Sequence, residues 1–320
     1  MAQYRAVQIN EDGHPVVRLT EVDSGSEVAV SPEFGANSFD FHVNGKRVFW
    51  TPPNATLSEL IARSRLCGNP LLSPWANRIE GLSYKANGKQ YTLNPALGNL
   101  RVDQNKNPIH GLVTFSKQWQ VREVAATKDE ALVRMSLDCS RQPDLLAQFP
   151  FPHRIELTYK LKAGQLEVVT SIENLASEAM PLAIGFHPYF QLNDAPRDEW
   201  EVTIPATELV VLSPTLIPTG ERKPNPYAGG VKLKGIALDD VFAGLPVGAT
   251  FRVRGKSQMI EVVYGKDYTI GVVYAPAGQS YICFEPMTAP TNAFNTPGSY
   301  KSIAPGVSWR ESYWIKTSGF

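Results

Sequence analysis

The chain has 320 residues, of which 43% are hydrophobic, and its 31 basic and 31 acidic residues balance to no net charge. This composition is typical of a soluble globular protein with a large core, and it gives no support to a nucleic-acid-binding surface or a polybasic membrane patch. No apolar stretch approaches the length of a membrane span, and the N-terminus lacks the basic and apolar blocks of a signal peptide, so we expect a cytoplasmic protein.

The first part of the chain predicts short antiparallel strands. Over residues 15–50 apolar side chains alternate with polar ones, and turn signals such as Asn44-Gly45 separate the runs. Asn-Gly is a favoured hairpin turn because both residues tolerate positive φ. The segment 56–65 is the best helix candidate, since its apolar residues have helical spacing, and we expect it to be short and peripheral.

Strand patterns continue through the rest of the chain. The clearest hairpin spans 155–170, with Ala163-Gly164 at its turn. The Pro/Gly-rich stretch 212–230 is expected to be a surface excursion. We expect an all-β fold with a single domain over 1–320, since β-sandwiches often exceed about 200 residues as one unit. Further strands are predicted at 90–93, 118–124, 200–211, 230–233, 250–253, 259–264, 269–274, 281–284 and 307–315.

Cysteine usage and charge balance narrow the expected partners. Cys67, Cys139 and Cys283 are odd in number, far apart and without metal-ligand spacing, so we expect free buried thiols and no metal site. Balanced charge favours a small neutral or weakly charged molecule as the ligand, with neither nucleic acid nor membrane as a partner. A monomer or a homodimer is the expected assembly.

Two stretches share a pattern in which an apolar strand delivers an ionisable residue just before a proline. The stretch 182–190 carries His187, and the stretch 281–286 carries Glu285. Proline restricts the residue before it to extended backbone, so both side chains have defined directions. With the period of two of a strand, each ionisable group opposes an apolar neighbour and leaves the core side. We therefore predict that His187 and Glu285 face one groove.

Three weaker signals add further candidate residues. Arg78 ends an irregular segment beside Asn77, and its guanidinium can hold sugar hydroxyls or a carboxylate, or pair with an acidic side chain. His110 stands between a turn-forming dipeptide and a glycine, where a histidine is more often structural than catalytic. Asp239 and Asp240 lie between apolar residues, a position that ordinarily indicates a turn or a solvated loop.

In chain order, five segments resemble those of the aldose 1-epimerase family, the galactose mutarotases. The match spans most of the chain, and the resemblance implies a large antiparallel β-supersandwich whose concave face holds a sugar. The segments are Pro-Trp-Ala-Asn-Arg-Ile at 74–79, His-Gly-Leu at 110–112, Gly-Phe-His-Pro-Tyr-Phe at 185–190, Asp-Asp-Val-Phe at 239–242 and Phe-Glu-Pro-Met-Thr-Ala-Pro-Thr-Asn-Ala-Phe-Asn at 284–295.

The resemblance also implies roles for individual residues. Glu285 looks like the general base on the C1 hydroxyl of the sugar, His187 like the general acid on the ring oxygen, and His110 like a second donor near that centre. Trp75 replaces the phenylalanine more usual in this family and could stack on a sugar face or belong to the core. The substrate-binding residues implied are Arg78, Asp239 (in preference to Asp240), Asn77 and Trp75.

The chemistry also fits these residue types without the family name. Interconversion of sugar anomers requires that the C1 hydroxyl lose a proton while the ring oxygen gains one, so one base and one acid suffice. A glutamate in a partly apolar groove and a histidine that titrates near neutrality suit these two tasks. The leading hypothesis is an aldose 1-epimerase of carbohydrate metabolism that acts on a free hexose and needs no metal or organic cofactor.

Three other hypotheses compete with it. A phosphorylated or sulfonated hexose would need a basic cluster at one rim of the groove. A non-catalytic sugar-binding module could keep the binding residues without the acid–base pair, which this sequence retains. A glycosidase would need a second carboxylate beside Glu285, and the histidine would then have no task. The basic residues near the motifs in sequence are Lys85, Lys89, Arg101 and Lys106.

Overall fold

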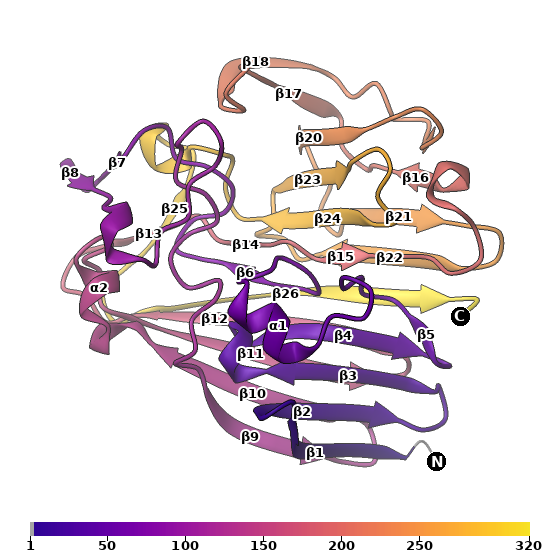
Figure 1. Cartoon of the computed structure of the whole chain (residues 1–320). Helices are drawn as coiled ribbons and strands as arrows, with labels where there is room; N and C mark the ends of the chain where they lie inside the picture. The colour runs from indigo at the N-terminus through magenta and orange to yellow at the C-terminus, as the bar shows by residue number, and fades with distance from the viewer. Residues whose placement is uncertain (1–2) are drawn as a thin grey trace.

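The computed structural model describes residues 3–320 and consists mostly of antiparallel strands (Figure 1). The predicted all-β fold is therefore confirmed. Two short helices occur among these residues, α1 (Leu57–Ala62) and α2 (Pro143–Leu146), and neither is long and apolar enough to cross a membrane. Single 3-10 turns lie at Pro32–Phe34, Pro95–Leu97, Cys139–Arg141, Arg197–Glu199 and Ala293–Asn295.

Helix α1 begins where the sequence predicts a helix but ends three residues earlier than the predicted end at Arg65. The Thr56 hydroxyl accepts a hydrogen bond from the Glu59 N–H, and the Glu59 carboxylate accepts one from the Thr56 N–H. This reciprocal capping box satisfies two of the free amides at the helix start. The chain then runs from α1 past Arg63 toward the candidate site.

Three large sheets account for most of the strands, and two small ribbons for the rest. The five-stranded sheet runs β1 (Tyr4–Glu11), β2 (His14–Glu21), β3 (Ser26–Ser31), β4 (Asn37–Val43), β5 (Lys46–Arg47). The nine-stranded sheet runs β19 (Val231–Lys232), β16 (Glu201–Thr203), β21 (Thr250–Arg254), β22 (Met259–Tyr264), β26 (Ser308–Ser318), β12 (Gln165–Asn174), β11 (His153–Lys162), β10 (Ala131–Asp138), β9 (Gln120–Ala126).

The third sheet has eight strands and carries the candidate site. Its order is β18 (Pro218–Pro224), β17 (Glu208–Leu212), β20 (Leu238–Ala243), β23 (Ile270–Ala275), β24 (Ile282–Met287), β14 (Gly185–Phe186), β6 (Leu71–Leu72), and β15 (Tyr189–Phe190) also pairs with β24. The two ribbons pair β7 (Ser83–Ala86) with β8 (Lys89–Thr92) and β13 (Met180–Leu182) with β25 (Lys301–Ile303).

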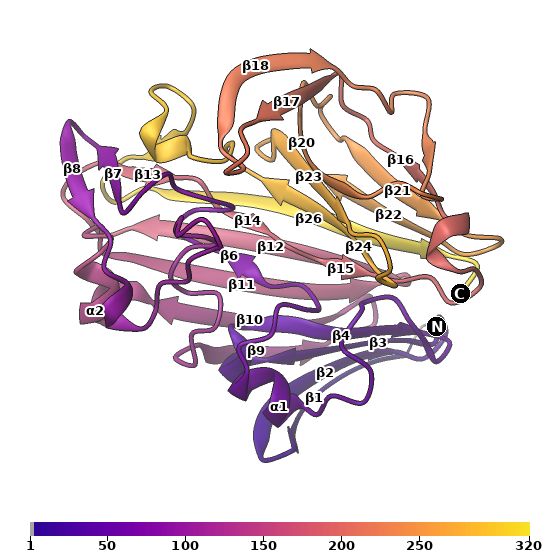
Figure 2. The same ribbon diagram turned by 45° about the horizontal axis from the view of Figure 1, so that its top comes forward.

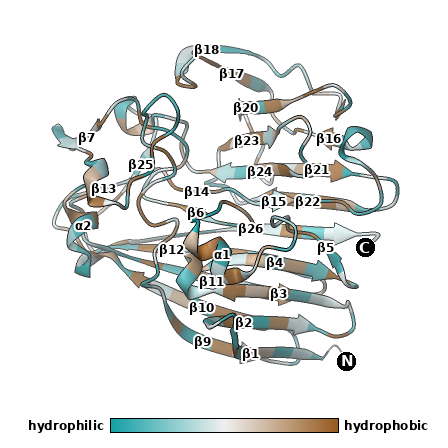
Figure 3. Cartoon of the chain, in the orientation of Figure 1, coloured by the Kyte–Doolittle hydropathy of each residue, from teal (hydrophilic) through white to brown (hydrophobic). Residues whose placement is uncertain are grey.

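The sheets pack face to face around a shared apolar core. Figure 2 shows β1–β4 beside β9 and β10 at one end of the molecule, with β17, β18 and β20 at the other. The Phe284 ring of the eight-stranded sheet lies 5.7 Å from the Phe251 ring of the nine-stranded sheet, measured between centroids. Apolar and polar residues alternate along β11. Figure 3, coloured by hydropathy, shows teal and brown bands along the strands. This alternation is what a sheet with one buried face requires.

The structure differs from the predicted elements in places where local pattern is weak. Strand β1 is mostly exposed and lacks a clear alternation, and neither β1 nor β10 was predicted. The predicted strand 200–211 is divided into β16 and β17, which belong to different sheets. The excursion 212–230 contains the exposed edge strand β18. The predicted free thiols are confirmed, since all three cysteines are buried and unpaired in residues 3–320.

Candidate active site

His187 and Glu285 lie directly opposite each other on neighbouring antiparallel segments. Strands β14 and β15 both pair with β24 in one register, with Gly185 opposite Met287 and Tyr189 opposite Cys283. Continuing this register places His187 opposite Glu285, and their side chains meet with Nε2 of the histidine 3.3 Å from Oε1 of the glutamate. The predicted encounter of these two residues is therefore confirmed.

The prolines that follow the two residues explain why the pairing of β24 with β14 and β15 is interrupted at His187. Pro188 and Pro286 have no N–H to donate, so neither can complete a ladder hydrogen bond. The His187 N–H turns away from β24 and donates to the Pro70 carbonyl oxygen at 3.0 Å. Unlike the predicted strand, β24 does not end before its proline but continues to Met287. The interrupted ladder leaves both side chains on a wall of the site.

Strand register brings a third ionisable residue onto the same face. In the pairing of β20, β23 and β24, Asp239 lies opposite Tyr274, and Val272 lies opposite Glu285. Because alternate residues of a strand share a face, Asp239, Tyr274, Val272 and Glu285 all project to one side. Asp240 projects to the other side, which agrees with the preference for Asp239.

A folded loop supplies the opposite part of the site. The His110 N–H donates to the Asn77 carbonyl oxygen at 2.8 Å, and the backbones of Ile109 and Arg78 form an antiparallel bridge. Asn77 and His110 have φ values of 56° and 67°, in the left-handed region that residues other than glycine rarely adopt. Arg78 Nε donates to Asp103 Oδ2 at 2.7 Å. Arg78 therefore pairs with an acidic side chain, which was one of the two interpretations of this residue.

These elements enclose a cavity of about 210 Å³. A volume below the ~300 Å³ typical of drug-sized ligands suits a single small molecule. The wall contains six of the seven residues singled out from the sequence: His187, Glu285, His110, Arg78, Asp239 and Asn77. The other lining residues are Leu66, Ile109, Tyr189, Val272 and Tyr274.

Burial shifts the catalytic candidates toward their neutral forms. Burial lowers the pKa of His187 to about 3, and the positive charges of Arg101 and Arg78 add to that effect. Burial and then the negative charge of Asp239 raise the pKa of Glu285 well above its ordinary value, with Arg78 opposing them. Both shifts favour the neutral forms of the pair, a carboxylic acid beside an uncharged imidazole with one titratable proton between them, over an ion pair.

The second histidine is also neutral. Burial, followed by the charges of His187 and Arg101, lowers the pKa of His110 well below its ordinary value. The rings of His110 and His187 lie 5.3 Å apart in an edge-to-face arrangement, and the Tyr189 ring stacks on His187 at 4.6 Å. This packing fixes the orientation of both imidazoles.

Three buried polar atoms of the site have no hydrogen-bond partner within residues 3–320. They are Nδ1 of His110, Nδ1 of His187 and Oε2 of Glu285. Buried polar atoms are nearly always paired, and exceptions gather at functional sites. Their concentration on three residues that line one cavity supports the assignment of this cavity as a candidate functional site.

Comparison with known proteins identifies the family. A family model described as aldose 1-epimerase matches residues 18–316, which is most of the chain. The chain belongs to the aldose 1-epimerase family. Human galactose mutarotase is 32% identical over 155 residues, which cover 47% of this chain and 40% of the human protein. The uncharacterized Escherichia coli protein YihR is 25% identical over 233 residues, 71% of each chain.

Solved structures show the same architecture. A galactose mutarotase-like protein from Clostridium acetobutylicum superposes with a TM-score of 0.87 at 22% identity, covering 100% of this chain and 99% of its own. Galactose 1-epimerase from Lactobacillus acidophilus gives a TM-score of 0.80 at 15% identity over 100% of both chains. These likenesses establish the galactose mutarotase-like fold of this aldose 1-epimerase family member.

The structure agrees with the core interpretation of Trp75, and two tyrosines extend the set of candidate residues. Trp75 is 2% exposed, packs near the rings of Tyr84 and Phe294 in the core, and does not line the cavity, so it cannot stack on a sugar there. The sequence analysis did not select Tyr189 and Tyr274, which line the cavity. Tyr189 follows His187 by two positions, and this spacing could have indicated a shared face.

Proposed function

We propose that this protein is an aldose 1-epimerase that interconverts the α and β anomers of a hexose through its open-chain form. One observation supports the proposal above the others. A carboxyl and an imidazole lie 3.3 Å apart on the wall of a small cavity, and each retains an unpartnered polar atom. An acid and a base held close together are what anomer interconversion needs.

Ring opening can be written with the protons balanced. Moving the one proton of the pair from Glu285 to His187 produces a carboxylate and an imidazolium. The carboxylate takes the proton of the C1 hydroxyl, the imidazolium protonates the ring oxygen, the bond between C1 and that oxygen breaks, and the C1 carbonyl forms. After rotation about the C1–C2 bond, the same steps in reverse close the ring. Each cycle returns the pair to one proton, so no metal or organic cofactor is required.

The remaining cavity residues supply binding. His110 donates to the oxygens near the reacting centre, while Arg78, Asp239 and Asn77 hold ring hydroxyls. The hydrogen bonds from Arg78 to Asp103 Oδ2 and to Asn77 Oδ1 fix the guanidinium before a sugar arrives. Such prior ordering lowers the entropic cost of binding.

Substitution of the pair tests the proposal. Glu285→Gln and His187→Asn should each slow the mutarotation of freshly dissolved α-glucose and α-galactose, followed by polarimetry, by about 10² to 10⁴. His14→Asn, at a histidine paired with Glu33 away from the cavity, is the matched control and should retain the wild-type rate. A wild-type rate in either site variant removes that residue from the mechanism. Binding of the sugars without acceleration in the wild type would indicate a non-catalytic sugar-binding module.

A further inference from the structure

The backbone of His187 is held by the neighbouring segment 68–72. This segment contains β6 and runs beside the His187 stretch on the side opposite β24. The His187 N–H donates to the Pro70 carbonyl oxygen at 3.0 Å. Two residues on, the Tyr189 N–H donates to the Gly68 carbonyl oxygen at 2.7 Å. Because the pairing with β24 is interrupted at His187, the position of this histidine depends on the segment 68–72.

Asn69 lies between the two carbonyl groups that hold this stretch, and its own polar atoms are all engaged elsewhere. Its Oδ1 accepts a hydrogen bond from the Tyr313 hydroxyl at 2.6 Å, and its Nδ2 donates to Ser38 Oγ at 3.1 Å. Its backbone N–H donates to Asn37 Oδ1 at 2.7 Å. Breaking any of these bonds would leave a buried polar atom unpaired, so together they fix the position of Asn69.

The partners of Asn69 come from the two other large sheets. Asn37 and Ser38 belong to β4 of the five-stranded sheet, and Tyr313 belongs to β26 of the nine-stranded sheet. The Asn37 Nδ2 also donates to the Cys67 carbonyl oxygen at 2.9 Å. A buried polar network with every member paired specifies a single arrangement. Asn69 therefore sets the segment beside His187 relative to both other sheets.

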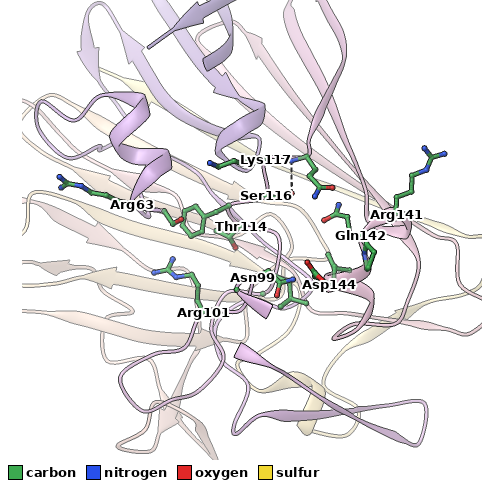
Figure 4. Close-up of a pocket in the computed structure, with 17 residues that line it drawn as sticks. Arg63, Asn99, Arg101, Thr114, Ser116, Lys117, Arg141, Gln142 and Asp144 are labelled. Carbon is green, nitrogen blue, oxygen red and sulfur yellow. Dashed lines mark hydrogen bonds between the residues drawn. The ribbon is translucent and has the colours of Figure 1, made fainter. Parts of the chain in front are cut away.

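Asn69 and Tyr313 do not belong to a ligand-binding wall. Within residues 3–320, neither lines the candidate active-site cavity, and neither lines the larger cavity of about 490 Å³ that Figure 4 shows. Neither side chain has exposed surface. Any effect of these two residues on catalysis must therefore pass through the groups that they place.

We propose that Asn69 is a positioning residue for the acid–base pair and that Tyr313 acts through it. The inference rests on the proposed function, because it assigns His187 a proton-transfer role. Releasing Asn69 would let the backbone that holds His187 shift, and with it the 3.3 Å separation of His187 Nε2 from Glu285 Oε1. A misplacement of about 1 Å in a reacting group can cost about 10² in rate.

Removal of one hydroxyl tests the inference. Tyr313→Phe should lower kcat for mutarotation of α-glucose at least about tenfold, with KM within about twofold of wild type, because proton transfer and not sugar binding is disturbed. Tyr84→Phe is the matched control, since the Tyr84 hydroxyl is also buried and donates to the Gln148 carbonyl oxygen at 2.9 Å. Both variants should lose stability in urea, but Tyr84→Phe should keep the wild-type kcat.

A double-mutant cycle gives a second readout. Asn69→Ala should lower kcat at least as much as Tyr313→Phe, and the double variant should lose no more than Asn69→Ala alone, because both changes break the same bond. Ser38→Ala, which removes only the acceptor of Asn69 Nδ2, supports the same cycle if Asn69→Ala does not fold. Its loss combined with that of Tyr313→Phe should be smaller than the product of the two single losses.

The outcomes separate this inference from the proposed function. A wild-type kcat in Tyr313→Phe, an equal loss of kcat in Tyr84→Phe, or a change confined to KM overturns the inference alone. Losses that multiply in the double variant overturn it as well, because the two residues would then act independently. No acceleration of mutarotation by the wild-type protein overturns the proposed function and this inference with it.

Discussion

At the scale of the residue, Glu285 is the group whose chemistry conflicts most with its surroundings. Its surface is 2% exposed, its Oε2 has no partner within residues 3–320, and the nearby Asp239 carries a like charge. A buried carboxyl in this setting favours its neutral form, and the protein is less stable wherever the pH would ionise it. Keeping the glutamate here is therefore a cost in stability that only function accounts for.

We predict that the Glu285→Gln variant becomes more stable relative to the wild type as the pH rises. The folded-state pKa of Glu285 lies above the unfolded value of 4.5, so its contribution to stability is fully present below pH 4.5 and is lost as the pH rises toward the folded-state pKa. Glu285→Gln has no carboxyl group to titrate, so its stability does not fall with pH for this reason. Its advantage in free energy of unfolding should grow by about 1.4 kcal/mol per pH unit across that interval.

Urea denaturation at pH 4, 6 and 8 measures that advantage. Glu201→Gln, at an exposed residue of β16, is the control and should give a difference from wild type that does not change with pH in this way. An advantage of Glu285→Gln that is the same at pH 4 and pH 8 would contradict the burial argument.

At the scale of the element, the loop that presents His110 depends on one close backbone approach. Gly111 has φ of +73°, and a Cβ there would lie 2.1 Å from the Ser73 carbonyl oxygen. The N–H of Leu112 donates to that same oxygen at 2.8 Å. Because Ser73 immediately precedes residues 74–78, which include Asn77 and Arg78, a shift at Gly111 moves both walls of the candidate active-site cavity.

A pair of glycine substitutions separates backbone conformation from close packing. Gly88 also has φ of +73°, but a Cβ there would meet nothing within 4 Å. Gly88→Ala should cost about 1–2 kcal/mol of unfolding free energy for the left-handed conformation alone. Gly111→Ala should cost about 1–3 kcal/mol more, because the Ser73 carbonyl must move, and should also lower mutarotation. Denaturation curves of equal midpoint for the two variants would exclude the steric contribution.

At the scale of the whole molecule, β26 holds the nine-stranded sheet together. It lies between β22 and β12, so it joins the strands from the second half of the chain to the β9–β12 group. Tyr313 and Ile315 of this strand have no exposed surface. Removing β26 would expose two strand edges and part of the core at once.

A truncation tests this dependence. A chain that lacks 308–320 should show no cooperative thermal unfolding and should aggregate, because β12 and β22 lose their common neighbour. A chain that lacks only Gly319 and Phe320 keeps all of β26 and should still unfold cooperatively. Calorimetry and size-exclusion chromatography distinguish these outcomes. Cooperative unfolding of the longer truncation would show that the two parts of the sheet are stable apart.

Sequence reasoning succeeded where a local pattern fixes a side-chain direction. The strand period and the following prolines predicted that His187 and Glu285 face one groove, and the two side chains meet on one cavity wall. Asn44-Gly45 forms its predicted turn with positive φ at both residues. In each case the deciding information lies within a few residues of the position concerned.

Sequence reasoning left the outcome open, or missed it, where distant residues decide it. Trp75 lies in an irregular segment, and its core position depends on Tyr84 and on Phe294, which is more than 200 residues away in the chain. Arg63, Arg101 and Lys117 line one cavity because the end of α1 packs near the loop that follows β8. No local sequence pattern predicts that contact. Strand β1 has a weak pattern because most of its side chains are exposed.

The position of β26 also bears on how the protein is made. During translation, β12 leaves the ribosome more than a hundred residues before β26, and β22 leaves it more than forty residues before. Both strands must wait with one unpaired edge each until residues 308–318 emerge. Nascent chains should therefore be most dependent on chaperones just before residues 308–318 emerge, because the nine-stranded sheet is complete only once β26 has taken its place.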